Sequence, residues 1–128
     1  MKKVLISILS VILLVGCFQG ESKMQYQTIT SEEAMKRFVE ETDYIIIDVR
    51  TIEEYESGHI PGSINIPNET IQEEIEEKIP DKNQVIYIYC RSGNRSAQSA
   101  KKLVDLGYQN IYDFGGINTW TGEIVVGE

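Results

Sequence analysis

Two short apolar runs constrain the fold of this chain more than any other feature. Residues 44–47 and residues 85–89 each form an uninterrupted run of isoleucine, valine and tyrosine. A strand that is apolar on both faces is typical of a parallel sheet whose two sides are covered by helices. The two runs therefore predict buried strands, the first ending near Asp48 and the second ending at Cys90.

Shorter strands and intervening helices complete the pattern. Further strands are expected at residues 26–29, 63–66 and 111–112, with a helical pattern after each of the first four strands. Strands that alternate with helices are typical of α/β domains. The sequence therefore predicts a three-layer α/β fold, in which a mostly parallel five-stranded sheet is flanked by helices.

The expected helices begin at polar residues of the kind that cap helices. Two of them begin with a capping box, in which a glutamate follows a threonine by three residues. The last helix is expected to end at Gly107, because glycine readily adopts the left-handed conformation found there. The expected N-caps are Thr30, Thr51, Asn68 and Ser96.

The first residues have the pattern of a secretory signal. Lys2 and Lys3 precede an apolar run over residues 4–15, which is too short to span a bilayer comfortably. Residues 14–17, ending in Gly16 and Cys17, resemble the bacterial lipobox, in which the cysteine is lipidated and becomes the new N-terminus. An uncleaved anchor, or a plain signal with a chance cysteine, are the alternatives.

This resemblance implies a division of the chain into a leader and one folded domain. Residues 1–16 would be a signal peptide, residues 17–25 a tether and residues 26–128 the domain. The protein would be exported and held by a lipid on Cys17 at the outer face of a bacterial membrane, or in the periplasm.

The net charge of −8 excludes some partners. An acidic chain is poorly suited to bind nucleic acid or anionic lipid headgroups. Membrane attachment would therefore depend on the lipid and not on a basic patch. We expect a monomer.

The chain has two cysteines, and lipidation of Cys17 would leave Cys90 without a partner. This excludes a disulfide framework and marks Cys90 as a thiol with a possible chemical role. Cys90 heads a loop between a buried strand and a helix, which is where α/β proteins bind ligands. Backbone N–H groups in such a loop, together with the helix N-terminus, form an anion site.

Three residues of this loop support that interpretation. Gly93 permits the tight backbone turn, and Arg91 and Arg95 supply positive charge. Such surroundings favour the thiolate, which is the nucleophilic form of cysteine. A buried structural cysteine at a strand end is the alternative interpretation.

The chain resembles the rhodanese family of sulfurtransferases over residues 26–122. The resemblance lies in four patches: residues 47–50, residues 58–67, residues 90–96, and residues 115–117 with Trp120.

The resemblance implies that Cys90 takes sulfur from a small anionic donor such as thiosulfate and becomes a persulfide. The persulfide sulfur would then pass to cyanide or a thiol. Arg91 and Arg95 would bind the anionic donor, and no metal or organic cofactor would be required. The backbone amides that would cradle the sulfur belong to Arg91, Ser92, Gly93, Asn94 and Arg95.

The resemblance also bears on the supporting residues and on other functions. It implies that Asp48 and Arg50 tie a strand end to nearby loops. His59 is set in a Gly-His-Ile-Pro-Gly turn, which favours a hydrogen-bonded structural residue over a general base. Four residues separate Cys90 from Arg95, whereas related phosphatases have one more, so sulfur chemistry is favoured over phosphate. A non-enzymatic module that carries or senses sulfur, or docks a partner, remains an alternative.

Overall fold

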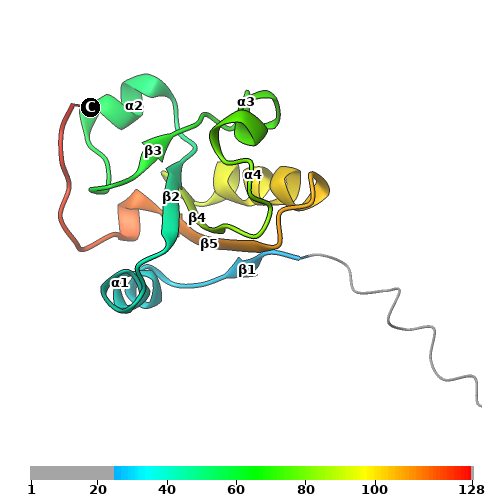
Figure 1. The fold of residues 1–128 in the computed structure, drawn as a ribbon. Coiled ribbons are helices and arrows are strands. Elements are labelled where there is room, and N and C mark those ends of the chain that lie inside the picture. The colour runs from blue at the N-terminus through cyan, green and yellow to red at the C-terminus, as the bar shows by residue number, and fades with distance from the viewer. Residues whose placement is uncertain (1–24, 128) are drawn as a thin grey trace, which may run out of the picture.

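The structure is a computed structural model, and it describes residues 25–127. The expected signal, the lipobox and most of the tether lie outside these residues. No helix within residues 25–127 is long and apolar enough to cross a membrane. The elements, shown in Figure 1, are β1 (Gln27–Thr28), α1 (Ser31–Glu40), β2 (Tyr44–Asp48), α2 (Ile52–Ser57), β3 (Ile64–Asn65), α3 (Ile71–Lys78), β4 (Val85–Cys90), α4 (Asn94–Asp105), β5 (Asn110–Gly116) and the short 3-10 helix η2 (Ile117–Thr119).

The five strands form one parallel sheet in the order β1-β5-β4-β2-β3. The two apolar runs of the sequence are β2 and β4, and they pair directly, with Tyr44 opposite Val85 and Asp48 opposite Tyr89. Because all strands are parallel, their carboxyl ends meet at one edge of the sheet. The predicted five-stranded α/β architecture is confirmed.

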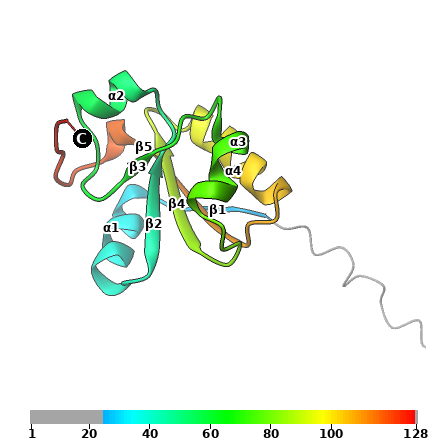
Figure 2. The same cartoon turned by 45° about the horizontal axis from the view of Figure 1, so that its top comes forward.

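Helices cover both faces of the sheet, as Figure 2 shows: α3 and α4 lie on one face and α1 lies on the other. The two cores differ in composition. The face under α3 and α4 is mainly aliphatic, whereas the face under α1 is rich in aromatic rings. Aliphatic members include Ile47, Ile71, Ile75, Ile88 and Leu103. Aromatic members include Phe38, Tyr44, Tyr87, Phe114 and Trp120.

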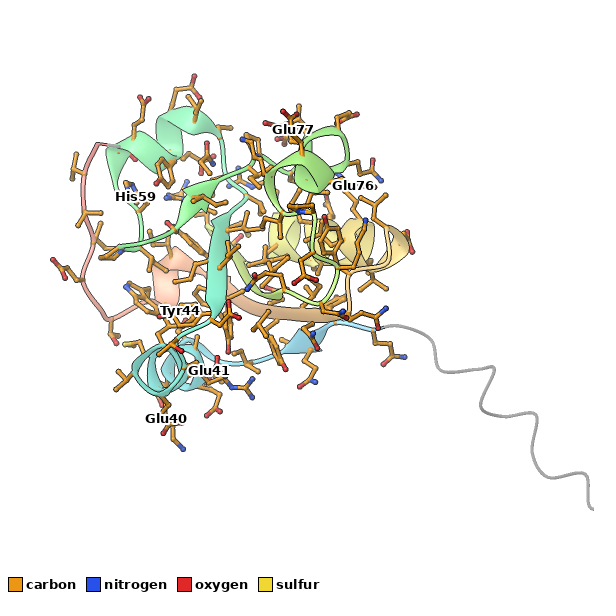
Figure 3. All side chains as sticks on the ribbon, in the orientation of Figure 1. Glu40, Glu41, Tyr44, His59, Glu76 and Glu77 are labelled. Atoms are coloured by element: carbon orange, nitrogen blue, oxygen red, sulfur yellow. The ribbon has the colours of Figure 1, made fainter. Side chains whose placement is uncertain are left out.

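The outer surface of α3 is acidic, as expected for a solvated helix face. Glu76 and Glu77 project from this helix in Figure 3 and are exposed. The buried side of the same helix carries Ile71 and Ile75.

Two of the four expected N-caps are confirmed. The Thr30 hydroxyl accepts the Glu33 N–H at 3.1 Å at the start of α1. Thr51 and Glu54 form a complete capping box at the start of α2, where the backbone N–H of each residue donates to the side chain of the other. Helix α4 ends at Asp105 with Leu106 as its C-cap, and Gly107 follows with the left-handed φ of 96° that the sequence predicted after the helix.

The prediction that Asn68 caps a helix is wrong. Helix α3 begins at Ile71, and Asn68 is buried beside α4. The Asn68 side chain accepts the Ser99 hydroxyl at 2.7 Å and donates to Gln98 at 2.9 Å. Its amide is therefore used to join two distant segments, and it leaves the start of α3 without a side-chain cap.

The prediction that Ser96 caps α4 is also wrong. The helix begins two residues earlier at Asn94, and Gly93 takes the cap position with a left-handed φ of 108°. The Ser96 hydroxyl donates to the Gly93 carbonyl at 3.1 Å from within the first turn. The helix N-terminus therefore lies closer to Cys90 than the sequence indicated.

Candidate active site

Cys90 is the last residue of β4 and is only 1% exposed. Its Sγ accepts the Gly93 N–H at 3.0 Å and lies 3.6 Å from the Ser96 Oγ. Just before it, the pairing of β4 with β5 shifts register, a bulge of the kind that re-aims a side chain. The loop therefore folds back over the sulfur and points a backbone donor at it.

The remaining loop residues lie at the surface. Arg91, Ser92 and Asn94 are exposed, whereas Gly93 and Arg95 are half-buried. The Arg91 carbonyl accepts the Asn118 N–H at 3.2 Å, which fixes the loop to η2. Among the five predicted loop residues, Gly93 contacts the Cys90 sulfur through its backbone N–H, whereas the Arg91 side chain lies in solvent.

Gly116 packs against this loop so closely that no side chain fits. A Cβ atom at this position would lie 2.0 Å from the Arg91 carbonyl oxygen and 2.7 Å from the Ser92 nitrogen. Gly116 at the end of β5 therefore provides the surface on which the loop rests.

Arg95 is held by a residue that the sequence analysis did not assign to the site. Its Nη1 and Nη2 donate to the Glu54 carboxylate at 2.7 and 3.0 Å. The hydrogen bond from Arg95 is the main reason that the pKa of Glu54 falls to about 2. The capping box was the available signal, because it placed Glu54 just beyond the carboxyl end of a buried strand.

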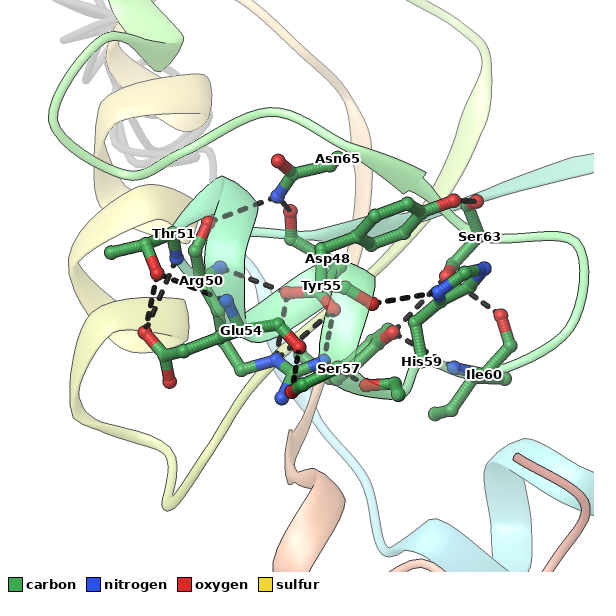
Figure 4. A network of polar contacts seen from close by, with 12 residues as sticks. Asp48, Arg50, Thr51, Glu54, Tyr55, Ser57, His59, Ile60, Ser63 and Asn65 are labelled. Atoms are coloured by element: carbon green, nitrogen blue, oxygen red, sulfur yellow. Dashed lines mark hydrogen bonds and ion pairs between the residues drawn. The ribbon is translucent and has the colours of Figure 1, made fainter. Parts of the chain in front are cut away.

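Asp48 and Arg50 form a buried ion pair at the end of β2, drawn in Figure 4. The Arg50 Nη2 donates to Asp48 Oδ2 at 2.7 Å and to the Gly58 carbonyl at 2.6 Å. The Asn65 amide donates to the backbone carbonyls of both Asp48 and Arg50. These contacts tie the end of β2 to α2 and β3, and Arg50 binds both oxygens of the Asp48 carboxylate.

His59 is buried in the turn that follows α2, and Figures 3 and 4 place it beside that helix. Its ring stacks on Tyr55 at a centroid distance of 3.7 Å, and its Nδ1 lies 2.8 Å from the Tyr55 carbonyl oxygen. Its backbone pairs with Val125. These are the contacts of a structural residue.

A buried carboxylate lies behind the thiol loop. Asp113 on β5 accepts the Gly115 N–H at 2.9 Å, and burial raises the pKa of this carboxyl above its ordinary value. The Ser96 hydroxyl links the same region to the loop, because it lies 3.3 Å from the Gly115 carbonyl. The sequence analysis did not single out Asp113, since a lone aspartate in a short strand carries no pattern.

The site is a buried thiol at the start of a helix. The Gly93 N–H bonds the Cys90 sulfur, α4 begins at the next residue, and Arg91 and Arg95 belong to the same loop. Residues 25–127 contain no group of three or more histidine, cysteine, aspartate and glutamate side chains able to hold a metal ion. Cys90 is thus the nucleophilic candidate.

Comparison with known proteins agrees with this geometry. The family description "Rhodanese-like domain" matches residues 30–123. The thiosulfate sulfurtransferase PspE of Escherichia coli is 39% identical over 71 residues, which cover 56% of this chain and 68% of PspE. The thiosulfate sulfurtransferase GlpE of Coxiella burnetii is 34% identical over 98 residues, covering 76% of this chain and 89% of GlpE.

A solved structure gives the same result for the fold. A structure described as a rhodanese with anions, from E. coli, superposes with a TM-score of 0.62 at 36% identity, covering 66% of this chain and 99% of its own. The resemblance expected from the four sequence patches is therefore confirmed, and the chain belongs to the rhodanese-like domain family.

Proposed function

We propose that the protein is a sulfurtransferase, acting as a monomer, that moves sulfane sulfur from a donor such as thiosulfate to cyanide or a thiol. The observation that carries this proposal is the contact between Cys90 Sγ and the Gly93 N–H at 3.0 Å, within a loop closed by Arg95. A backbone donor aimed at sulfur stabilises negative charge on a thiolate and on the persulfide formed from it.

In the first step, the Cys90 thiolate attacks the sulfane sulfur of thiosulfate. The sulfur–sulfur bond of the donor breaks, and sulfite leaves with the bonding electron pair. Cys90 then carries a persulfide whose outer sulfur bears the negative charge. No net oxidation occurs and no further reactant is needed.

In the second step, the acceptor attacks the outer sulfur of the persulfide. With cyanide, a carbon–sulfur bond forms, thiocyanate is released and the Cys90 thiolate is restored. The persulfide must discharge to an external acceptor when Cys17 carries a lipid, because the chain has no third cysteine.

The other site residues would act by binding and positioning. Arg91 is exposed beside Cys90 and would attract the anionic donor. The backbone amides of the loop would cradle the transferred sulfur. The pair of Asp48 and Arg50, together with His59 and Ser96, would hold the strand ends that carry the loop.

A direct assay tests this function. The purified chain is incubated with thiosulfate and cyanide, and thiocyanate is measured against Cys90→Ser. We expect turnover in the native chain only, and a mass increase of about 32 Da on Cys90 after exposure to thiosulfate alone, which corresponds to one sulfur atom. Equal thiocyanate formation by both proteins would refute the proposal.

The 1% exposure of Cys90 favours a second candidate, in which the domain holds sulfur for a protein partner. A persulfide that forms on Cys90 but persists in the presence of cyanide and small thiols would support this carrier function. Hydrolysis of an aryl phosphate by the native chain would instead favour the phosphatase alternative.

We further propose that the protein is exported and anchored by a lipid on Cys17. The support is the sequence of residues 14–17 behind a charged and then apolar leader. Mass spectrometry of the membrane-associated protein should show loss of residues 1–16 and a lipid on Cys17. A soluble Cys17→Ser protein is expected, and an unmodified Cys17 in the native chain would refute the anchor.

A further inference from the structure

The Glu54 carboxylate is held by two residues, because it accepts hydrogen bonds from both Arg95 and Thr51. Both terminal nitrogens of Arg95 are bound to the two carboxylate oxygens, at 2.7 and 3.0 Å. The same carboxylate accepts the Thr51 N–H at 3.3 Å and the Thr51 hydroxyl at 3.1 Å. Glu54 is therefore anchored by the start of α2, and Arg95 is turned toward it by a bidentate pair.

This arrangement changes the charge that a donor meets. Arg95 belongs to the same loop as Cys90, but its charge is balanced by the bidentate pair with Glu54. Arg91 is exposed and takes part in none of the ion pairs found in residues 25–127. The site therefore presents about one uncompensated positive charge, although its loop contains two arginines.

Sulfane donors differ in the charge that they bring to such a site. Thiosulfate is a dianion, whereas an organic thiosulfonate carries one negative charge and the same kind of transferable sulfur. Attack by Cys90 on a thiosulfonate forms the same persulfide and releases a sulfinate with the bonding electron pair. Arg91 would balance one negative charge of thiosulfate. The second negative charge would be repelled by the Glu54 carboxylate, because Arg95 is already paired with it.

We infer that Glu54 is a specificity-determining residue that balances Arg95 and so shifts the preference of the site toward sulfane donors with a single negative charge. This inference rests on the sulfurtransferase function proposed above. It assigns to Glu54 a role beyond capping α2, because the carboxylate that completes the capping box is also the partner of the loop arginine.

The test compares two donors in the full-length chain and in Glu54→Gln. The kcat/KM values for thiosulfate and for benzenethiosulfonate are measured with cyanide as the acceptor. The one oxygen of glutamine can keep the contacts with Thr51, whereas its amide nitrogen cannot accept from Arg95, so the substitution removes the charge and one of the two Arg95 hydrogen bonds. We expect the ratio of thiosulfate to benzenethiosulfonate efficiency to rise by about fivefold at low ionic strength. The rise should shrink as salt screens the charges.

Two matched variants separate charge from structure. Glu53→Gln changes the net charge equally on the adjacent, exposed residue of α2 and should leave the ratio unchanged. Thr51→Ala weakens the start of α2 but keeps the carboxylate, so it should affect both donors alike. An unchanged ratio in Glu54→Gln, an equal rise in Glu53→Gln, or a rise that is insensitive to salt would overturn the inference.

The mass of Cys90 distinguishes this failure from failure of the proposed function. If both donors load a persulfide on the native chain but the ratio does not respond to Glu54→Gln, only the inference fails. If neither donor loads Cys90, the sulfurtransferase function fails, and the role of Glu54 fails with it.

Discussion

The ends of β2 and β4 lie side by side in the sheet, yet they use their charged residues in opposite ways. At the end of β2, Asp48 and Arg50 are buried and satisfy each other. At the end of β4, Cys90 is buried, but the loop beyond it leaves Arg91 in solvent. The end of β2 is stabilised by an ion pair between its own side chains. At the end of β4, a backbone N–H bonds the Cys90 sulfur.

The difference suggests separate roles for the two strand ends: the ion pair at the end of β2 stabilises the fold, and the loop after β4 carries the candidate nucleophile. A buried ion pair tolerates little change, because loss of either partner leaves an unpaired charge in the interior. In the loop after β4, Arg95 is bound to Glu54, but Arg91 stays in solvent and is available for a ligand. Substitutions at the two strand ends should therefore differ in whether they reduce folding or turnover.

The largest effect is expected from Cys90→Ser, which should lower sulfur transfer by more than about a thousandfold. The free energy of unfolding should change by no more than about 1 kcal/mol, because the Gly93 N–H and Ser96 can bond the new hydroxyl. Thiocyanate assays and urea denaturation measure the two quantities. A large loss of stability would show that the β4 end is also structural.

At the end of β2, Arg50→Met should reduce the free energy of unfolding by about 3–5 kcal/mol, because Asp48 would remain charged and buried. The double variant Asp48→Asn with Arg50→Met should recover part of this loss, since no unpaired charge remains. Urea denaturation of the three proteins provides the comparison. A single variant as stable as the native chain would remove the contrast between the two ends.

Gly116→Ala should combine both kinds of effect. The new Cβ would clash with the Arg91 carbonyl, so the loop must shift. We expect a loss of about 1–3 kcal/mol in stability and a fall in turnover approaching 100-fold. Gly107→Ala is the control, because it strains a left-handed glycine at the opposite end of α4. That variant should lose stability but not turnover; equal losses of turnover would contradict the steric role of Gly116.

The smallest effect concerns pH. Because Arg95 lowers the pKa of Glu54 from 4.5 to about 2, this carboxylate stabilises the fold fully above pH 4.5 and loses that contribution as the pH falls toward 2. The stability difference between the native chain and Glu54→Gln should therefore be less than about 1 kcal/mol at pH 7 and should decline below pH 4.5. Denaturation curves at several pH values test this, and a difference that grows on acidification would contradict it.

Local sequence patterns were sufficient to predict the sheet and most of the thiol loop. Strands β2 and β4 are each encoded by a continuous apolar run, and Cys90, Gly93 and Arg95 lie close together in the sequence. Both features can therefore be recognised from neighbouring residues alone. The prediction of Asn68 as an N-cap failed because its side chain binds partners brought near by tertiary structure, and that of Ser96 failed because α4 begins two residues earlier with Gly93 as its cap. Asn68, for example, is bonded to a residue 31 positions away.

The partnership of Glu54 with Arg95 could not be read from the sequence for a related reason. The two residues are 41 positions apart and meet only because β2 and β4 are neighbours in the sheet. The capping box placed Glu54 just beyond the end of β2 but also explained that residue locally, so it did not indicate the pairing with Arg95.

Because all strand pairs are parallel, the amino ends of the strands face one way and their carboxyl ends face the other. The described chain enters the sheet at the amino end of β1, whereas Cys90 stands at the carboxyl end of β4. Gln27 at the start of β1 pairs with Tyr112, which pairs with Tyr87, so the entry point lies three residues before the level of Cys90, or about 10 Å along the strands. In a protein held to a surface by its N-terminus, that surface would lie on the entry side, and the thiol loop would face outward, toward whatever delivers or collects the sulfur.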